Sequence, residues 1–263
     1  MGRLQRLSLF RTPDVAESPA SQWPRSGRVA AASTLVLGGV LNAGMWLALG
    51  SNLDSHETID YLRWIAAHPD RANLAAALGL LAMPFLFGTA LVYVLLSRKR
   101  SPRLAYTGGI LLGCGFFGLS VILGSEIPVA RLAQNGGIDL TALSSVSDHT
   151  LISSAAPSIV LALLFFPGAV FGLLTMAVAL WRSCAVPRGA VVLIAAFVVL
   201  DFGLQLAVPA HLILAAAAFW MASAVLRAGS ASQPVAQSAV GVVVEPGAAG
   251  GRPELRLRPE PEG

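Results

Sequence analysis

The stretch Ser97-Arg98-Lys99-Arg100-Ser101-Pro102-Arg103 decides how this chain is organised. It is a short, strongly basic link between two long apolar runs, residues 72–96 and 104–124. Links rich in Lys and Arg stay on the cytoplasmic side of a membrane, so this one fixes the direction in which the two flanking runs cross.

The composition of the whole chain agrees with a membrane protein. The 263 residues have a mean hydropathy of +0.70, and 12% of them are charged, where a soluble domain carries about 25%. The charges gather in short links and tails, and the stretches between them are rich in Leu, Ala, Val and Gly. This pattern predicts an all-α fold, a polytopic transmembrane helix bundle.

Six apolar runs are long enough to be spans, at about 29–49, 72–96, 104–124, within 151–180, 190–207 and 210–226. We expect the last two to form a tight hairpin at Val208-Pro209. The membrane domain then covers 29–227, between a disordered basic tail at 1–28 and a disordered tail rich in Pro, Gly and Ala at 228–263. The glycine pairs Gly109/Gly113 and Gly168/Gly172 have the GxxxG spacing of packed membrane helices.

The Lys and Arg residues predict the orientation. With six spans, fifteen of them fall on one face of the membrane and three on the other, Arg63, Arg71 and Arg131. This bias places both termini in the cytoplasm. The great excess of Arg over Lys is typical of a high-GC, bacterial genome, so we expect a multi-pass protein of the plasma membrane.

Two links lie on the opposite, outer face. In the first, residues 57–67 place Ile59, Leu62 and Ile65 on one side of a helix, with Tyr61 and Trp64 suited to the headgroup zone. We expect a short amphipathic helix on the outer surface there. The second link, 127–150, is polar and has room for one short helix.

The candidate site is an intramembrane carboxyl group, Asp201. Counting about 1.5 Å per residue along each span places Asn42 at a similar depth, with Gln205 one turn further out and His211 at the start of the returning helix. We predict one polar pocket formed by Asp201, Gln205, His211 and Asn42. Ser120, Glu126 and the acids of the first outer link could form its mouth.

Two interpretations of Asp201 remain open at this point. A carboxylate inside a span costs about 2.5–3.5 kcal/mol on insertion scales. It either titrates or binds a ligand under an outer vestibule, or it is a structural clasp that hydrogen-bonds Asn42 or Gln205.

Other site chemistry has less support. His56, His68, His149 and His211 are far apart in sequence and lack the spacings of zinc motifs. No Walker, GxSxG or dinucleotide-binding glycine pattern is present, so we expect no metal and no cofactor. The net charge of +4 comes from basic residues in the links, and no basic face with interleaved aromatic residues predicts nucleic-acid binding. The expected partner is the lipid bilayer.

The order of features resembles a group of uncharacterised actinobacterial six-helix integral membrane proteins of the domain-of-unknown-function type. The resemblance rests on the stretch from Tyr61 to Pro69 (YLRWIAAHP), on Leu78-Gly79-Leu80-Leu81, and on the basic link with its glycine-rich following span. It covers about 30–227 and implies the same architecture. The group brings no assigned activity or catalytic residue.

The sequence therefore predicts a non-enzymatic, membrane-embedded binding or envelope-support protein. The alternatives are a small transporter or proton-coupled carrier that uses Asp201, and a membrane enzyme that acts on lipid. The enzyme would need a bound metal or a clustered nucleophile and base.

Overall fold

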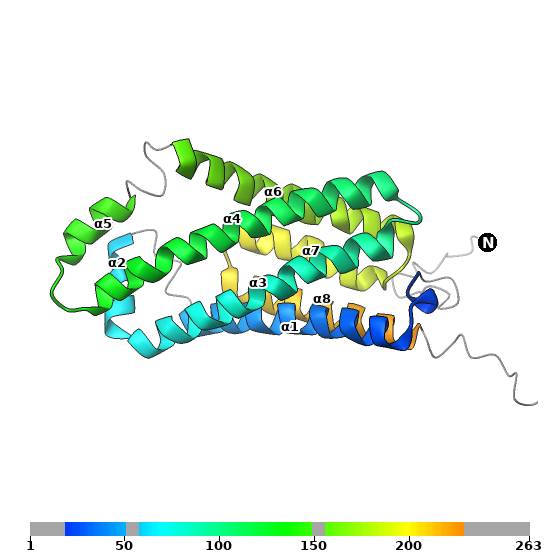
Figure 1. The fold of residues 1–263 in the computed structure, drawn as a ribbon, viewed down its shortest axis with the longest axis horizontal. Helices are drawn as coiled ribbons and strands as arrows, with labels where there is room; N and C mark the ends of the chain where they lie inside the picture. Colours follow the sequence, from blue (N-terminus) through cyan, green and yellow to red (C-terminus); the bar gives the residue numbers. More distant parts are fainter. Residues whose placement is uncertain (1–18, 51–57, 149–155, 229–263) are drawn as a thin grey trace, which may run out of the picture. The chain divides into compact units, whose positions relative to one another are not determined.

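The computed structural model describes residues 19–50, 58–148 and 156–228 (Figure 1). The chain divides into two units, Met1–Ser232 and Gln233–Gly263, and the second lies outside the described residues. Within the described ranges the regular elements are all helices. In chain order they are η2 (Pro19–Gln22), α1 (Arg25–Leu49), α2 (Thr58–Ala67), α3 (Pro69–Ser97), α4 (Pro102–Gln134), α5 (Leu140–Asp148), α6 (Ala156–Ser183), α7 (Arg188–Val198), the π-helix η5 (Val199–Gly203) and α8 (Ala207–Arg227).

Five helices in the described ranges are long and apolar enough to cross a membrane: α1, α3, α4, the Leu164–Ser183 part of α6, and α8. The remaining predicted span corresponds to α7 and η5. Their 11 and five residues together rise about 24 Å, less than a hydrocarbon core of about 30 Å. The predicted end of this span near residue 207 is corrected to Gly203, where the helix stops.

The helices of this unit form a closed ring. In spatial order α1 packs on α3, α3 on α4, α4 on α6, α6 on α7, α7 on α8, and α8 returns to α1. Successive long helices run antiparallel, so α1 begins and α8 ends at the same end of the bundle (Figure 1). That end carries the basic link 97–103, and α2 and α5 lie at the other end.

The basic end is closed by buried chain. The link between α6 and α7 includes Ala185 and Val186, which are buried, and Ala20 of η2 packs in the same core with Trp23 beside it. Gln22 accepts a hydrogen bond from Lys99 of the basic link. The bundle therefore begins before residue 28, the predicted end of the N-terminal tail, because η2 and the first turn of α1 already belong to it.

The other end holds a second, smaller core. α4 continues through Pro128 to Gln134, ten residues past the predicted end of its span. Leu62 and Ile65 of α2 are buried there with Ala133 of α4 and Leu143 of α5. The apolar side of α2 thus packs on protein, and its location on a membrane surface stays a prediction.

Glycines set the closest helix contact, between α4 and α6. A Cβ added at Gly168 would lie 2.7 Å from the Gly115 nitrogen and 2.7 Å from the Leu111 oxygen, and one at Gly172 would lie 2.6 Å from the Leu112 nitrogen. Glycines at these positions let the two backbones touch. Gly113 makes no such approach, since nothing lies within 4 Å of an added Cβ, so the Gly109/Gly113 pair is not the contact that its spacing predicts.

Candidate functional site

A cavity lies inside the ring, lined by residues of α1, α3, α4, α6, α7, η5 and α8. It offers about 90 Å³ in which the centre of a water molecule can lie. That is space for several waters or for part of a small organic molecule. The lining is mostly apolar, and its side chains with a carboxyl, amide, imidazole or hydroxyl group are Asn42, Thr89, Tyr93, Asp201 and His211.

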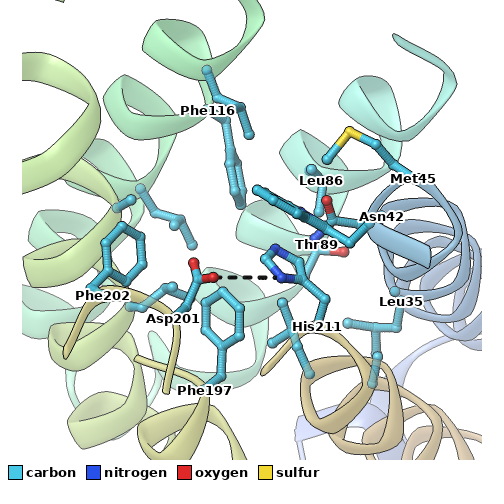
Figure 2. A pocket seen from close by; sticks show the side chains of 18 of the residues that line it. Leu35, Asn42, Met45, Leu86, Thr89, Phe116, Phe197, Asp201, Phe202 and His211 are labelled. Carbon is cyan, nitrogen blue, oxygen red and sulfur yellow. Dashed lines mark ion pairs between the residues drawn. The ribbon is translucent and has the colours of Figure 1, made fainter. Parts of the chain in front are cut away.

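Asp201 and His211 both line the cavity, and their side chains face one another (Figure 2). The His211 Nδ1 lies 3.6 Å from the Asp201 Oδ1, and the two side chains are 6% and 15% exposed. Asp201 comes from η5 and His211 from the second turn of α8, so the turn between these helices brings the pair together. An acid and an imidazole this close share one electrostatic environment, and the charge of one favours the opposite charge on the other.

The hydrogen bond of His211 to the Ala207 carbonyl defines the roles of its two ring nitrogens. Nδ1 lies 2.8 Å from the Ala207 carbonyl oxygen, and because a carbonyl only accepts, Nδ1 must carry the hydrogen. Nε2 is then the nitrogen that can accept a proton or a hydrogen bond. Trp46 stacks on the imidazole at 4.7 Å between ring centroids, and Phe197 meets it edge to face at 5.1 Å, which fixes the ring.

A change of helix geometry sets the position of Asp201. The last turn before the hairpin is a π-helix, closed by the Leu204 N–H donating to the Val199 carbonyl at 3.0 Å. One π turn holds an extra residue compared with an α turn, so the side chains beyond it rotate relative to the α-helical register. Such turns occur often at functional sites.

The structure brings three of the four predicted site residues to one cavity. Asn42 is 6% exposed and lines it together with Asp201 and His211. Gln205 does not. It lies exposed in the turn after η5 with φ of 55°, because the helix has ended at Gly203 and no further turn places it above Asp201. Asp201 is therefore paired with His211, and the expected clasp through Gln205 is corrected.

Aromatic side chains make up much of the lining, and the sequence reading missed them. They come from every lining helix except α8: Trp46, Tyr93, Phe116, Phe165, Phe197 and Phe202. Phe197 and Phe202 meet at 6.2 Å with perpendicular rings. One signal was available: Phe197 precedes Asp201 by four residues and Tyr93 follows Thr89 by four, the spacing of one helix face.

The charge of the cavity comes from its one acid. Among the described residues that line it, none is Lys or Arg. Thr89 adds a buried hydroxyl oxygen that has no hydrogen-bond partner in the described part of the chain. The site can therefore offer a carboxylate, an imidazole nitrogen and aromatic faces to a bound molecule.

Of the expected mouth residues, Ser120, Glu126 and Asp60 are described and do not line this cavity, while Asp54 and Glu57 lie outside the described residues. Glu126 lies in a second, smaller pocket with Tyr61 of α2. Burial, and then the Glu126 charge, raise the pKa of the Tyr61 phenol further above neutral pH. Ser120 instead donates to the Phe116 carbonyl of its own helix at 2.8 Å.

Histidines and cysteines form no further site in the described ranges. His68 stacks on Trp64 at 5.2 Å, and His56 and His149 lie outside the described residues. No group of three His, Cys, Asp or Glu side chains in the described residues could hold a metal ion. Cys114 and Cys184 are free thiols.

The five candidate spans and the closed ring define the class: a multi-pass helical membrane protein. The chain matches no known family model, and comparisons with curated proteins and with solved structures find no similar protein.

Proposed function

We propose that this protein is a membrane-embedded binding protein for a small organic cation with apolar substituents. One observation carries the proposal: the cavity in the bundle combines one carboxyl group with aromatic walls. Ligand sites are mostly apolar with a few polar groups that fix orientation. Aromatic faces attract ammonium groups, by about 2 kcal/mol or more where water is excluded.

The roles within the site follow from the geometry. Asp201 supplies the charge that pairs with the cation, while the faces of Phe197 and Phe202 border the same space. Trp46 holds His211 in place by stacking on its ring. Asn42 lines the cavity from α1 and is positioned to accept a hydrogen bond from a protonated amine.

The location belongs to the same proposal. The protein sits in the plasma membrane with six crossings, with α7 and η5 as the shortest, and with its basic end in the cytoplasm. The gathering of Arg25, the basic link and Arg227 at one end of the bundle supports this orientation.

The test is equilibrium binding of radiolabelled benzyltrimethylammonium to the full chain in lipid nanodiscs. Asp201→Asn keeps the side-chain shape and removes the charge, so affinity falls at least tenfold. Asp60→Asn is the matched control, because Asp60 is an exposed acid of α2 paired with Arg63 at 3.2 Å, and its loss leaves binding unchanged. Equal affinity of Asp201→Asn and the unaltered protein contradicts the proposal.

Transport coupled to protons is the second candidate, and the Asp201–His211 pair favours it. A cation that enters beside the carboxylate competes with a proton bound by the Asp201 carboxyl group, since both neutralise the same charge. In proteoliposomes, protons moving inward down their gradient would then drive the cation outward, and Asp201→Asn would abolish this flux. Binding without flux would contradict transport and leave the proposed binding function unchanged.

A further inference from the structure

Met45 separates the Asp201 cavity from the Glu126 pocket. Its side chain lines both spaces and is 3% exposed. The thioether lies over Gly79 of α3, where an added Cβ would come within 2.7 Å of the sulfur. Met45 therefore occupies the room that glycine leaves on α3, and this one side chain is shared by the walls of the two spaces.

The Glu126 pocket repeats the chemistry of the larger cavity on a smaller scale. Its lining comes from α1, α2, α3 and α4, with alkyl side chains around Glu126 and Tyr61. Among these described lining residues there is one acid and no base. It offers about 40 Å³ to the centre of a water molecule, room for an ammonium head but not for a whole aromatic cation.

We propose that the Glu126 pocket is an outer site for the ammonium head of the same cation, and that the cation reaches Asp201 when the Met45 side chain moves off Gly79. This inference rests on the proposed function and adds the path to the site. The path begins at the end of the bundle that carries α2 and α5.

The physical properties of the three residues support the path. Methionine is unbranched and flexible, so it can change rotamer where a branched side chain would stay fixed. A tyrosine phenol is neutral at neutral pH, so Tyr61 provides an aromatic face without a second negative charge. Two carboxyl groups then border consecutive spaces along one route, and the larger space retains the ligand because only it has room for the apolar substituents.

The first experiment follows access and does not depend on cation binding. A water-soluble carbodiimide with a dimethylaminopropyl ammonium group is added to the protein in nanodiscs, and modification of Asp201 is timed by mass spectrometry. Met45→Ala removes the barrier, so Asp201 is modified at least tenfold faster than in the unaltered protein. Met83→Ala is the matched control, because Met83 is also buried in the bundle, at 7% exposure, and lines neither space.

Met45→Val is a smaller truncation that guards against misfolding of Met45→Ala, and it gives an intermediate rate. Equal rates for Met45→Ala and Met83→Ala overturn the path, even if cation binding at Asp201 is found. A fast Met45→Ala rate without any binding of benzyltrimethylammonium keeps the path and removes the proposed ligand.

The second experiment addresses Glu126 itself. Glu126→Gln slows the association of benzyltrimethylammonium at least fivefold in stopped-flow measurements, while the affinity changes less than threefold, because the final site is intact. An unchanged association rate overturns the outer site.

Discussion

The α4–α6 contact and the α7–α8 hairpin are opposite solutions to helix packing in one bundle. Between α4 and α6 the backbones touch, with the Gly168 Cα facing Gly115 so closely that a Cβ would be 2.7 Å from its nitrogen. At the hairpin, a π turn and a two-helix corner leave an open cavity in which Asp201 faces His211 at 3.6 Å.

The difference shows where this bundle gains its cohesion. Lipid tails are as apolar as Leu, so membrane helices associate through close packing and hydrogen bonds. Glycine contacts at α4–α6 supply dispersion attraction between whole backbones. The cavity beside the hairpin has no such glycine contacts. Polar side chains can lie there because the space can hold water or a ligand. We therefore expect the two regions to respond differently to substitution.

The largest effect is expected at the tight contact. Gly168→Ala places a methyl group against the backbone of α4, and the two helices must separate. Overpacking of this kind costs about 3 kcal/mol, at the upper end for cores, because backbone atoms cannot rotate away. The free energy of unfolding, measured by denaturant titration in mixed micelles, falls accordingly.

Gly113→Ala is the control for this substitution, since Gly113 lies on α4, the other helix of the contact, and nothing lies within 4 Å of its added Cβ. It changes the unfolding free energy little, or raises it through better helix propensity. Equal changes in unfolding free energy for Gly168→Ala and Gly113→Ala would show that the close α4–α6 contact at Gly168 does not set the cost of the substitution.

A smaller effect is expected at the hairpin. His211→Leu leaves Asp201 without its neighbour, and a buried polar group that loses its partner costs about 1–3 kcal/mol. The double variant Asp201→Leu/His211→Leu recovers most of this loss, because replacing both partners with apolar groups can be nearly neutral. Thermal unfolding of the unaltered protein, of the single variants Asp201→Leu and His211→Leu, and of the double variant gives the coupling between the two positions.

Losses that simply add in the double variant would contradict this expectation and would make the 3.6 Å approach energetically irrelevant. Cation binding is lost in both Asp201 variants whichever way stability moves. The stability of the pair and its use in binding are thus measured separately.

The same contrast explains what the sequence could and could not predict. The basic link 97–103 and the apolar runs were enough to predict a helical membrane bundle, because length and hydropathy are properties of each segment alone. The glycine spacing predicted close packing, but not that Gly168 makes the contact and Gly113 makes none. Which face of a helix meets its neighbour depends on the positions of both helices.

The candidate site was predictable only in part. Asp201, His211 and Asn42 were selected because polar side chains inside spans are expensive, and the structure places all three on one cavity. The early end of this helix at Gly203 was not foreseen, since Leu204, Leu206 and Ala207 continue the apolar run. The counted position of Gln205 depended on an α-helical register that η5 interrupts.

The smallest effect concerns that same turn. Gln205 has φ of 55°, a left-handed conformation that costs a residue with a Cβ about 1–2 kcal/mol. Gln205→Gly removes this strain, and the greater freedom of glycine in the unfolded chain offsets part of the gain. We expect the unfolding free energy to rise by about 0.5 kcal/mol, with unchanged affinity for benzyltrimethylammonium because Gln205 does not line the cavity. Cys184→Gly, at φ of 51° in the link after α6, is the matched control for the strain, and we expect a similar rise in the unfolding free energy. A loss of binding in Gln205→Gly, but not in Cys184→Gly, would show that Gln205 takes part in the binding site. It would mean that the turn between η5 and α8 rearranges when the cation enters.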